Sequence, residues 1–440
     1  MSTHDQRTPL GNGAAGEHER LAGEPGMTTD HQVLPDLADQ LLADYRPGVA
    51  SFFATRRHTL LGQGVHTLIR PDPASGAVTD LASQVRETLE RVRTRGTATP
   101  IAVGAVPFDN SAPAVGPLAK LVVPETIRFA GPLTRQVIVA GRAAPAEEPR
   151  TDWHIEQIPE PAAYRRGVAA ALTRLAEGEL DKVVLARSLR LTSDTDVDVP
   201  AMLRALARRD PHGYTFAVDL DDPDDQTAPP ACRGTLVGAS PELLLAKTGR
   251  QVVSRPLAGS AARASDPAED RRRAEALLAS AKDRHEHALV VAAVARSLGP
   301  FCRQLTVPTE PHLVRTAAMW HLATRITGEL ADERTSSLEL AAALHPTPAV
   351  CGTPVGAARA AIAEIEPFDR GFYTGVVGWC DSAGDGEWVV TLRCGVANGG
   401  TLTLFAGAGI VPGSVPESEL AETSAKFRTF LTAAGVHQPV

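Results

Sequence analysis

The chain has 440 residues, 43% of them hydrophobic and 22% charged, which is the composition of a soluble globular protein with a large core. Its net charge of −8 argues against nucleic acid as a partner, because nucleic-acid-binding surfaces are generally basic. The five cysteines are scattered without a CxxC pair, there is no secretory signal pattern, and no apolar run reaches the roughly 18 residues of a membrane span. We therefore expect a cytoplasmic protein without a disulfide framework, a zinc site or a membrane segment, and length alone predicts two or three domains.

The first third of the chain predicts a tail followed by short elements. Residues 1–30 have no apolar period and are rich in Gly, Thr and charge, so we expect a disordered tail. Helices are predicted from about residue 34 and over residues 81–93, where apolar residues recur at helical spacing. Strands are predicted at residues 51–55, 66–70, 101–106 and 136–140. The Pro- and Ala-rich segment 141–149 is either a domain boundary or a surface loop.

Lys182 is the first residue whose side chain suggests chemistry. A predicted helix over residues 161–177 is followed by a β-branched strand over residues 181–191. Within that strand the side chain of Lys182 shares a face with the apolar Val184. Burial among apolar neighbours favours the neutral amine, which would make Lys182 a candidate general base. The alternative is a lysine at a strand end that extends to water.

Glu242 is a second candidate for proton transfer. Strands are predicted over residues 214–220 and 235–238, and Glu242 precedes the next apolar run. A carboxyl group buried there would have a raised pKa and could act as a general acid, whereas a solvated glutamate at a strand end would not. Residues 254–260 predict a turn with exposed backbone amides.

Two predicted helices each carry a pair of carboxylates three residues apart. The first helix, expected to run unbroken over residues 266–298, carries Asp283 and Glu286, and the last helix carries Glu419 and Glu422. Oxygen ligands without a suitably spaced Cys or His favour Mg²⁺ over zinc. The alternative is that both pairs belong to ordinary solvated helix faces.

The segment between residues 345 and 426 contains the parts of an anion site. Residues 389–393 and 401–405 predict adjacent antiparallel strands, which would put Arg393 on a strand. Gly407 and its neighbours predict a turn after the second strand, whose free amides could hold a carboxylate. Neither a complete GxGxxG motif nor a Gly-Lys-Ser/Thr sequence is present, so we expect no nucleotide site.

Four motifs, which occur in the same order as in a known enzyme family, give a family resemblance. The segments LDKVVLAR (residues 180–187), SPE (240–242), KDRHEH (282–287) and AGAGIV (406–411) resemble those of the chorismate-utilising enzymes, which include anthranilate, aminodeoxychorismate, salicylate and isochorismate synthases. The resemblance implies a single α+β catalytic domain over residues 31–440, with two stacked antiparallel β-sheets flanked by helices, in place of several domains. Residues 31–150 match less distinctly than the motif-bearing residues 151–435.

The resemblance also implies a substrate, a cofactor and a set of site residues. The substrate would be the dianion chorismate, the cofactor would be Mg²⁺, and we expect a monomer that needs no glutaminase subunit. The catalytic residues would be Lys182 and Glu242. The metal-binding residues would be Asp283, Glu286, Glu419 and Glu422. The substrate-binding residues would be Gly259, Ser260, His321, Ala349, Tyr373, Arg393, Gly407 and Lys426.

Within the family, the segment HPTPAVCG (residues 345–352) looks like that of isochorismate synthases. Salicylate synthases tend to have Thr in place of Ala349, and anthranilate synthases tend to have Lys in place of Val355. The segment FDRGFY (368–373) looks like the siderophore branch, in which isochorismate leads to 2,3-dihydroxybenzoate. The alternatives are a salicylate synthase, an isochorismate synthase of the menaquinone pathway and a non-catalytic module that binds Mg²⁺ or a carboxylate.

The resemblance leads to a mechanistic hypothesis. Neutral Lys182 takes a proton from a water molecule, which attacks C2 of the chorismate ring. The double bonds shift, and the C4 hydroxyl leaves with a proton from Glu242. Each proton transfer could contribute roughly 10²–10⁴-fold in rate, and Mg²⁺ would screen the ring carboxylate.

Overall fold

Strand pairing organises the chain into two large antiparallel sheets and a small third one. The computed structural model describes residues 36–69, 78–95, 99–109, 119–133, 152–210, 213–221 and 233–436. The predicted tail at 1–30, the predicted strand at 136–140 and the segment 141–149 lie outside these ranges. Val33–Val440 form one compact unit. Within the described ranges, no helix has both the length and the apolar character needed to cross a membrane.

The first sheet brings distant parts of the sequence side by side. Its longest pairing joins β8 to β22, so the strand of Lys182 lies next to the strand of Gly407. In spatial order its strands are β18 (Gly352–Thr353), β8 (Lys182–Thr192), β22 (Thr401–Ile410), β21 (Cys394–Asn398), β10 (Thr235–Ser240), β9 (Tyr214–Asp219), β1 (Ala50–Ala54), β2 (Thr59–Gln63) and β6 (Thr126–Ala130), with β7 (His154–Ile158) also paired to β8.

The second and third sheets are built in the same antiparallel way. The second sheet contains, in spatial order, β14 (Cys302–Thr306), β17 (Ile326–Leu330), β12 (Gln251–Arg255), β11 (Leu243–Thr248), β20 (Gly386–Val390), β19 (Val376–Asp381), β4 (Ile101–Val106), β5 (Lys120–Val123) and β3 (Thr67–Ile69). The third sheet contains β13 (Leu257–Ala262), β16 (Met319–Ala323) and β15 (His312–Arg315).

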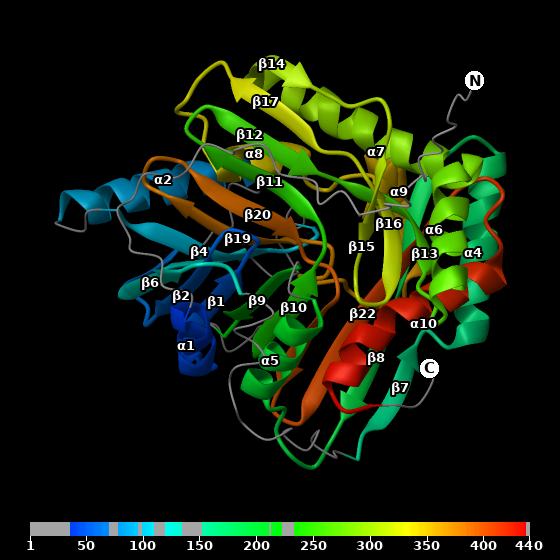
Figure 1. Ribbon diagram of the computed structural model, residues 1–440, viewed down its shortest axis with the longest axis horizontal. Coiled ribbons are helices and arrows are strands. Elements are labelled where there is room, and N and C mark those ends of the chain that lie inside the picture. The colour runs from blue at the N-terminus through cyan, green and yellow to red at the C-terminus, as the bar shows by residue number, and fades with distance from the viewer. Residues whose placement is uncertain are drawn as a thin grey trace, which may run out of the picture. The chain divides into compact units, whose positions relative to one another are not determined.

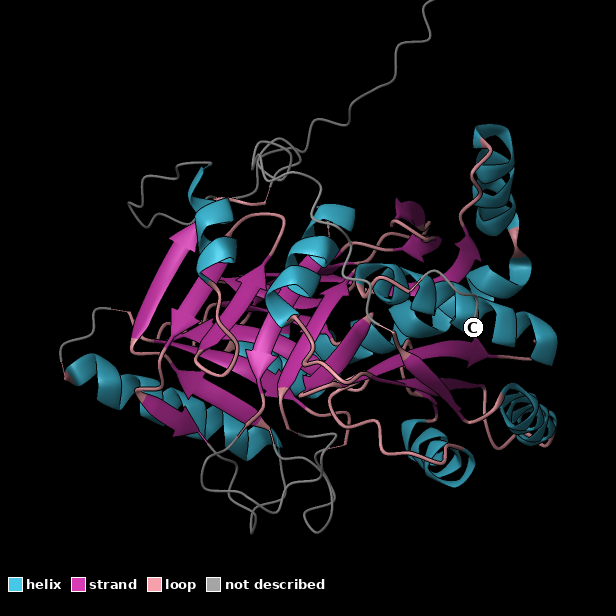
Figure 2. Ribbon diagram, turned by 90° about the horizontal axis from the view of Figure 1, so that it is seen from below, coloured by secondary structure: helices cyan, strands magenta, loops and turns pink. Residues whose placement is uncertain are grey.

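The two large sheets stack face to face through a shared apolar core. Phe53 of β1 and Phe216 of β9 pack in this core with Val103 of β4, which belongs to the second sheet. Phe52, the neighbour of Phe53, packs in a different cluster on the outer face of the first sheet. Because successive strand residues point to opposite faces, the apolar pair Phe52-Phe53 requires both faces to be covered. Figure 2 shows helices on both sides of the stacked strands.

Helices cover the outer faces of the two large sheets (Figure 1). Their bounds are α1 (Asp36–Asp44), α2 (Val78–Thr94), α4 (Pro161–Ala176), α5 (Val199–Arg209), α6 (Pro267–Ala279), α7 (Ala281–Leu298), α8 (Ser337–Leu344), α9 (Val355–Ile365) and α10 (Pro416–Ala433), with a short 3₁₀ helix η2 (Gly299–Phe301). Apolar residues of α1, α5 and α10 cover the first sheet, and those of α2, α7 and α8 cover the second. The α+β architecture with two stacked antiparallel sheets, implied by the family resemblance, is confirmed.

The predicted unbroken helix over residues 266–298 is wrong, because the chain breaks at Ser280. Ser280 has an extended backbone (φ −67°, ψ 115°) and separates α6 from α7. Its Oγ accepts a hydrogen bond from the backbone N–H of Asp283 at 3.3 Å, which caps α7. The break gives α7 its own direction, and α7 packs against β13 of the third sheet.

Two further predictions, one of a strand pair and one of a turn, are wrong. Residues 389–393 do not pair with residues 401–405, because β20 belongs to the second sheet and β21 pairs with β22 in the first. The chain crosses between the sheets at Arg393, whose φ of 45° is in the left-handed region. Residues 254–260 are not a turn, because they form the end of β12 and the start of β13.

Candidate active site

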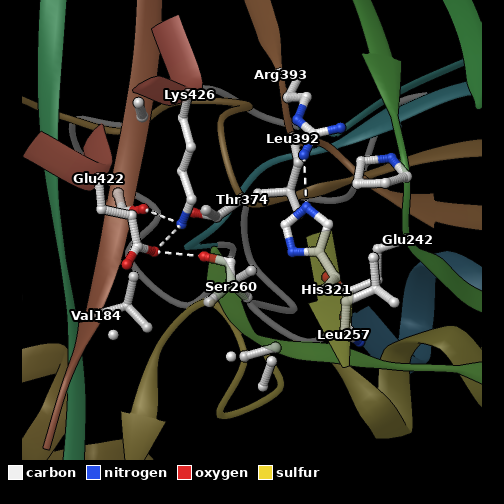
Figure 3. Close-up of a pocket in the computed structure, with 18 of the residues that line it drawn as sticks. Val184, Glu242, Leu257, Ser260, His321, Thr374, Leu392, Arg393, Glu422 and Lys426 are labelled. Carbon is white, nitrogen blue, oxygen red and sulfur yellow. Dashed lines mark hydrogen bonds and ion pairs between the residues drawn. The ribbon is translucent and has the colours of Figure 1, made fainter. Parts of the chain in front are cut away.

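A cavity is bordered by the first sheet and the small third sheet (Figure 3). Its walls come from β8, β22, β13 and β16, from helices α7 and α10, and from loops between the sheets. The expected site residues that line it are Glu242, Gly259, Ser260, Glu286, His321, Ala349, Tyr373, Arg393, Gly407, Glu422 and Lys426. Lys182, Asp283 and Glu419 do not line the cavity. Val184 and Lys426 both line the cavity, so the fold gathers residues that are about 240 positions apart in the sequence.

Lys182 lies immediately behind the cavity wall. Its side chain is fully buried, so the alternative that it extends to water is wrong. Its Nζ is 2.8 Å from Oε1 of Glu286, which does line the cavity. A Cβ at Gly409 would lie 3.0 Å from Cε of Lys182 and would overlap the Glu286 carboxylate. The glycine therefore allows Lys182 and Glu286 to approach β22 this closely.

Glu242 is a buried carboxyl group in the cavity wall. Burial raises the pKa of Glu242 to about 7, against the opposing effects of a hydrogen bond from the Leu257 amide and the charge of Lys182. The Leu257 N–H donates to Oε1 over 3.3 Å. The expectation of a buried carboxyl with a raised pKa is confirmed, and such a group can deliver a proton near neutral pH.

His321 and Arg393 form a buried pair. The Arg393 side chain is directed toward His321 on β16, and its Nη2 donates to Nε2 of His321 over 2.6 Å (Figure 3). Asp210 lies 4.0 Å from Nη1 of Arg393 on the other side. The pair therefore presents a guanidinium and an imidazole to the same cavity.

Lys426 and Glu422, one turn apart on α10, form a second charged pair. The Nζ of Lys426 donates to Oε1 of Glu422 over 2.6 Å and to the carbonyl oxygen of Gly407 over 2.8 Å. Ser260 donates to the same Glu422 oxygen over 2.8 Å (Figure 3). Burial alone would raise the pKa of Glu422, but the Lys426 ammonium and these hydrogen bonds outweigh it and lower that pKa. Glu422 is therefore held as a carboxylate.

The predicted turn at Gly407 is wrong. Gly407 lies inside β22 and pairs with Ala186 of β8, so its segment is a strand interior and not a turn. The Gly407 carbonyl oxygen accepts a hydrogen bond from Lys426. A side chain at this position would also crowd the Tyr373 hydroxyl, which lies 2.9 Å from where a Cβ would be.

Two of the four expected metal-binding carboxylates have pKa values that are raised in part by neighbouring carboxylates. Burial and the charges of Glu286 and Glu422 raise the pKa of Asp283, and burial and the charge of Glu422 raise that of Glu419. Lys282 donates to Oε1 of Glu419 over 3.0 Å. The expected carboxylates are thus near one another and interleaved with lysine ammonium groups.

Two of the expected metal-binding carboxylates could hold a metal ion that keeps most of its water ligands. Among the residues that the structure describes, no three His, Cys, Asp or Glu side chains converge as a metal site. Mg²⁺ usually takes one or two carboxylates and completes its shell with water and substrate oxygens. Glu286 and Glu422, both in the cavity wall, are a suitable pair for that kind of site.

Several apolar residues of the cavity wall were not expected from the sequence. They are Val184, Leu257, Ala258, Val350, Leu392, Phe405 and Ala406. Their residue types are those of any buried strand, so no sequence signal distinguishes them from the core. Thr374 was also missed, although its position next to Tyr373 could have suggested it.

Comparison with known proteins identifies the family. A profile described as chorismate binding enzyme matches residues 132–435. Isochorismate synthase DhbC of Bacillus subtilis is 51% identical over 410 residues, which are 93% of this chain and 99% of the relative. A crystal structure of a Bacillus anthracis protein assigned as a 2,3-dihydroxybenzoate-specific isochorismate synthase superposes with a TM-score of 0.82 at 45% identity, covering 91% of this chain and 100% of that one. The menaquinone-specific isochorismate synthase MenF of Escherichia coli superposes with a TM-score of 0.71 at 25% identity, covering 90% of each chain. The chain belongs to the chorismate-binding enzyme family.

Proposed function

We propose that this protein is an isochorismate synthase, which converts chorismate into isochorismate. The observation that carries the proposal is a buried carboxyl group, Glu242, with a pKa of about 7, in a cavity that also presents Arg393 and Lys426. A general acid next to two cations suits a reaction in which a dianion loses a hydroxyl group. A relative named isochorismate synthase, similar over nearly its whole length, supports the same assignment.

Arg393 and Lys426 are the residues proposed to hold the carboxylates of chorismate. The chain carries a net charge of −8, so a dianion needs local positive charge to enter the cavity. The guanidinium of Arg393 is buried and fixed by His321, and the ammonium of Lys426 is fixed by Glu422 and Gly407. Fixed cations in a water-poor cavity orient a dianion more strongly than mobile surface cations do.

Lys182 and Glu242 are the proposed proton carriers. Lys182, as the proposed general base, accepts a proton from water, and the water oxygen forms a bond to C2 of the ring. The ring double bonds shift, the bond from C4 to its hydroxyl breaks, and Glu242 supplies the proton with which that hydroxyl leaves as water. One water is consumed and one is released, so the product is an isomer of the substrate.

Mg²⁺ is the proposed cofactor. Glu286 and Glu422 would hold it, and when bound it would neutralise the charge of the substrate carboxylate and so favour attack on the ring. The Nζ atoms of Lys182 and Lys426 lie 2.8 Å and 2.6 Å from these two carboxylates and fix their orientation.

We infer that the product serves 2,3-dihydroxybenzoate formation. The structural relative assigned as specific for 2,3-dihydroxybenzoate has 45% identity, compared with 25% for the menaquinone-specific relative. Ala349 lines the cavity with a methyl group and offers no hydroxyl to the substrate. By family resemblance this favours release of isochorismate over its further conversion to salicylate.

The proposal is tested by incubating the purified chain alone with chorismate and Mg²⁺ and separating the products by chromatography. Accumulation of isochorismate, without added ammonia or a second subunit, is the expected result. Salicylate together with pyruvate would replace the proposal with a salicylate synthase. Unchanged chorismate would overturn it in favour of a binding module.

A further inference from the structure

A buried ion pair that the proposed chemistry does not use lies behind the cavity wall. Glu366, at the end of α9, and Arg370, four residues later, are 8% and 3% exposed, and neither lines the cavity. Arg370 donates from Nε to one Glu366 oxygen over 2.8 Å and from Nη2 to the other over 2.6 Å. This two-pronged contact fixes the plane of the guanidinium, so its remaining N–H groups point in set directions.

Those remaining N–H groups reach three separate segments of the chain. Arg370 donates to the carbonyl oxygen of Val350 over 2.7 Å and to that of Val184 over 2.8 Å. Its Nη1 also donates to Oγ1 of Thr374 over 3.3 Å. Val184, Val350 and Thr374 all line the cavity. A single guanidinium therefore holds together, from behind, three parts of one wall.

Glu366 connects the same pair to the strand that carries Lys182. Its Oε1 accepts a hydrogen bond from the backbone N–H of Ala186 in β8 over 2.7 Å. The contact made by Arg370 to Val184 is only two residues from Lys182 along that strand. The position of β8 relative to the cavity thus depends on both members of the pair.

Thr374 shows how firmly this wall is fixed. It is fully buried with a φ of 59°, an unfavourable conformation for a β-branched residue. Its N–H donates to the carbonyl of Thr391 over 2.8 Å, and its hydroxyl donates to that of Tyr373 over 2.6 Å. The Tyr373 ring stacks on Phe405 at 5.1 Å, and both rings line the cavity. Such a backbone persists only where several contacts, here including that from Arg370, determine it.

We propose that Arg370 and Glu366 are positioning residues for the reaction, which set the cavity wall against Lys182 and Glu242 without touching the substrate. A buried ion pair often adds no more stability than an apolar pair of similar volume, so stability alone does not account for it. Its hydrogen bonds, in contrast, all end on β8 or on the cavity wall. A displacement of about 1 Å in such a wall can lower a rate roughly 100-fold. This inference rests on the proposed function.

The substitution Arg370→Lys tests it. Lysine retains the charge opposite Glu366, but one ammonium cannot reproduce the planar fork that reaches Val184 and Val350 together. We expect thermal unfolding close to that of the unsubstituted protein, and kcat lowered by about tenfold or more. KM for chorismate should change less than about threefold, because Arg393 and Lys426 are untouched. The measurements are steady-state kinetics and circular dichroism, with kcat corrected for the folded fraction.

Two further variants separate positioning from folding. Glu366→Gln keeps an acceptor for Ala186 but loses the charged fork, so kcat per folded molecule should again fall with KM nearly unchanged. Glu364→Gln, on the same helix, removes only an exposed ion pair with Arg174 and should leave kcat as it is. If either substitution at the buried pair lowers stability while kcat per folded molecule stays at the unsubstituted level, the pair is merely structural and the inference is overturned. Failure of the unsubstituted protein to convert chorismate would instead overturn the proposed function.

Discussion

Arg393 donates a hydrogen bond from Nη2 to Nε2 of His321 over 2.6 Å inside the cavity (Figure 3). Burial, together with the charges of Arg393 and Lys426, lowers the pKa of His321 well below its usual value. The imidazole is therefore neutral, and because Nε2 accepts from Arg393, the ring proton is on Nδ1. His321 thus offers the cavity one hydrogen-bond donor, its Nδ1–H group, and carries no positive charge.

His321→Ala should lower kcat/KM by about 10- to 100-fold, the effect of one hydrogen bond in a site of charged groups. His321→Asn, whose amide nitrogen can replace Nδ1–H, should lose less. Both variants should keep the pH dependence of the unsubstituted protein between about pH 6 and pH 8, because a neutral His321 does not titrate there. Rates measured across that range check this, and a pH dependence that disappears in His321→Asn would contradict the neutral state assigned to the ring.

Glu242→Gln should lower kcat by at least about 100-fold, because glutamine cannot supply a proton to the leaving hydroxyl. In the unsubstituted protein Glu242 must be protonated to act, and burial raises its pKa to about 7. Its contribution to kcat/KM should therefore be complete at low pH and fall as the pH rises through about 7. The residual activity of Glu242→Gln should lack this fall. A variant that retained both the rate and the pH dependence would exclude Glu242 as the acid.

The same residue should make stability fall with rising pH, in the same direction as activity. Glu242 holds its proton more tightly in the folded chain, where its pKa is about 7, than in the unfolded chain, where it is 4.5. The stability gained is complete below the unfolded value and is lost as the pH rises through the folded one, a change of about 3 kcal/mol. Glu242→Gln, which does not titrate, should lose less stability than the unsubstituted protein between about pH 5 and pH 8. Urea unfolding at both pH values measures the difference, with the exposed Glu417→Gln as control.

Lys182→Ala should abolish turnover while chorismate still binds. The substitution removes the proposed base but leaves the cations Arg393 and Lys426 in the cavity. It also leaves Glu286 without its partner, so folding must be verified by circular dichroism before activity is compared. Calorimetric titration with chorismate measures the retained binding. Full activity in a folded Lys182→Ala protein would remove Lys182 from the mechanism.

The fold class and most of the cavity residues could be predicted because they depend on short motifs and on the family they resemble. The strand of Lys182 could be predicted from the sequence because its β-branched residues favour a β-strand. That Lys182 would approach Glu286, however, depends on how α7 packs against β13 of the third sheet, and no local pattern encodes a contact between residues so far apart.

The errors have local physical causes. Ser280 looks tolerable inside a helix, yet its side chain caps a new one, and the pattern Ser280-x-x-Asp283 is the signal that was available. Gly407 suggested a turn, but glycine here allows close approach to Tyr373 within a strand. Arg393 was predicted on a strand because its neighbours are β-branched, whereas the left-handed backbone that turns it into the cavity leaves no trace in composition.

Removal of Mg²⁺ is expected to abolish activity. Treatment with a chelator followed by dialysis should give inactive protein, and added Mg²⁺ should restore it. Glu286→Gln and Glu422→Gln should each raise the Mg²⁺ concentration needed for half-maximal activity by about tenfold or more, because each removes a carboxylate from the cavity wall. Glu417→Gln, at an exposed position on the same helix as Glu422, should not. Calorimetric titration with Mg²⁺ gives the same comparison without turnover. Undiminished activity after chelation would show that Glu286 and Glu422 serve only to hold Lys182 and Lys426.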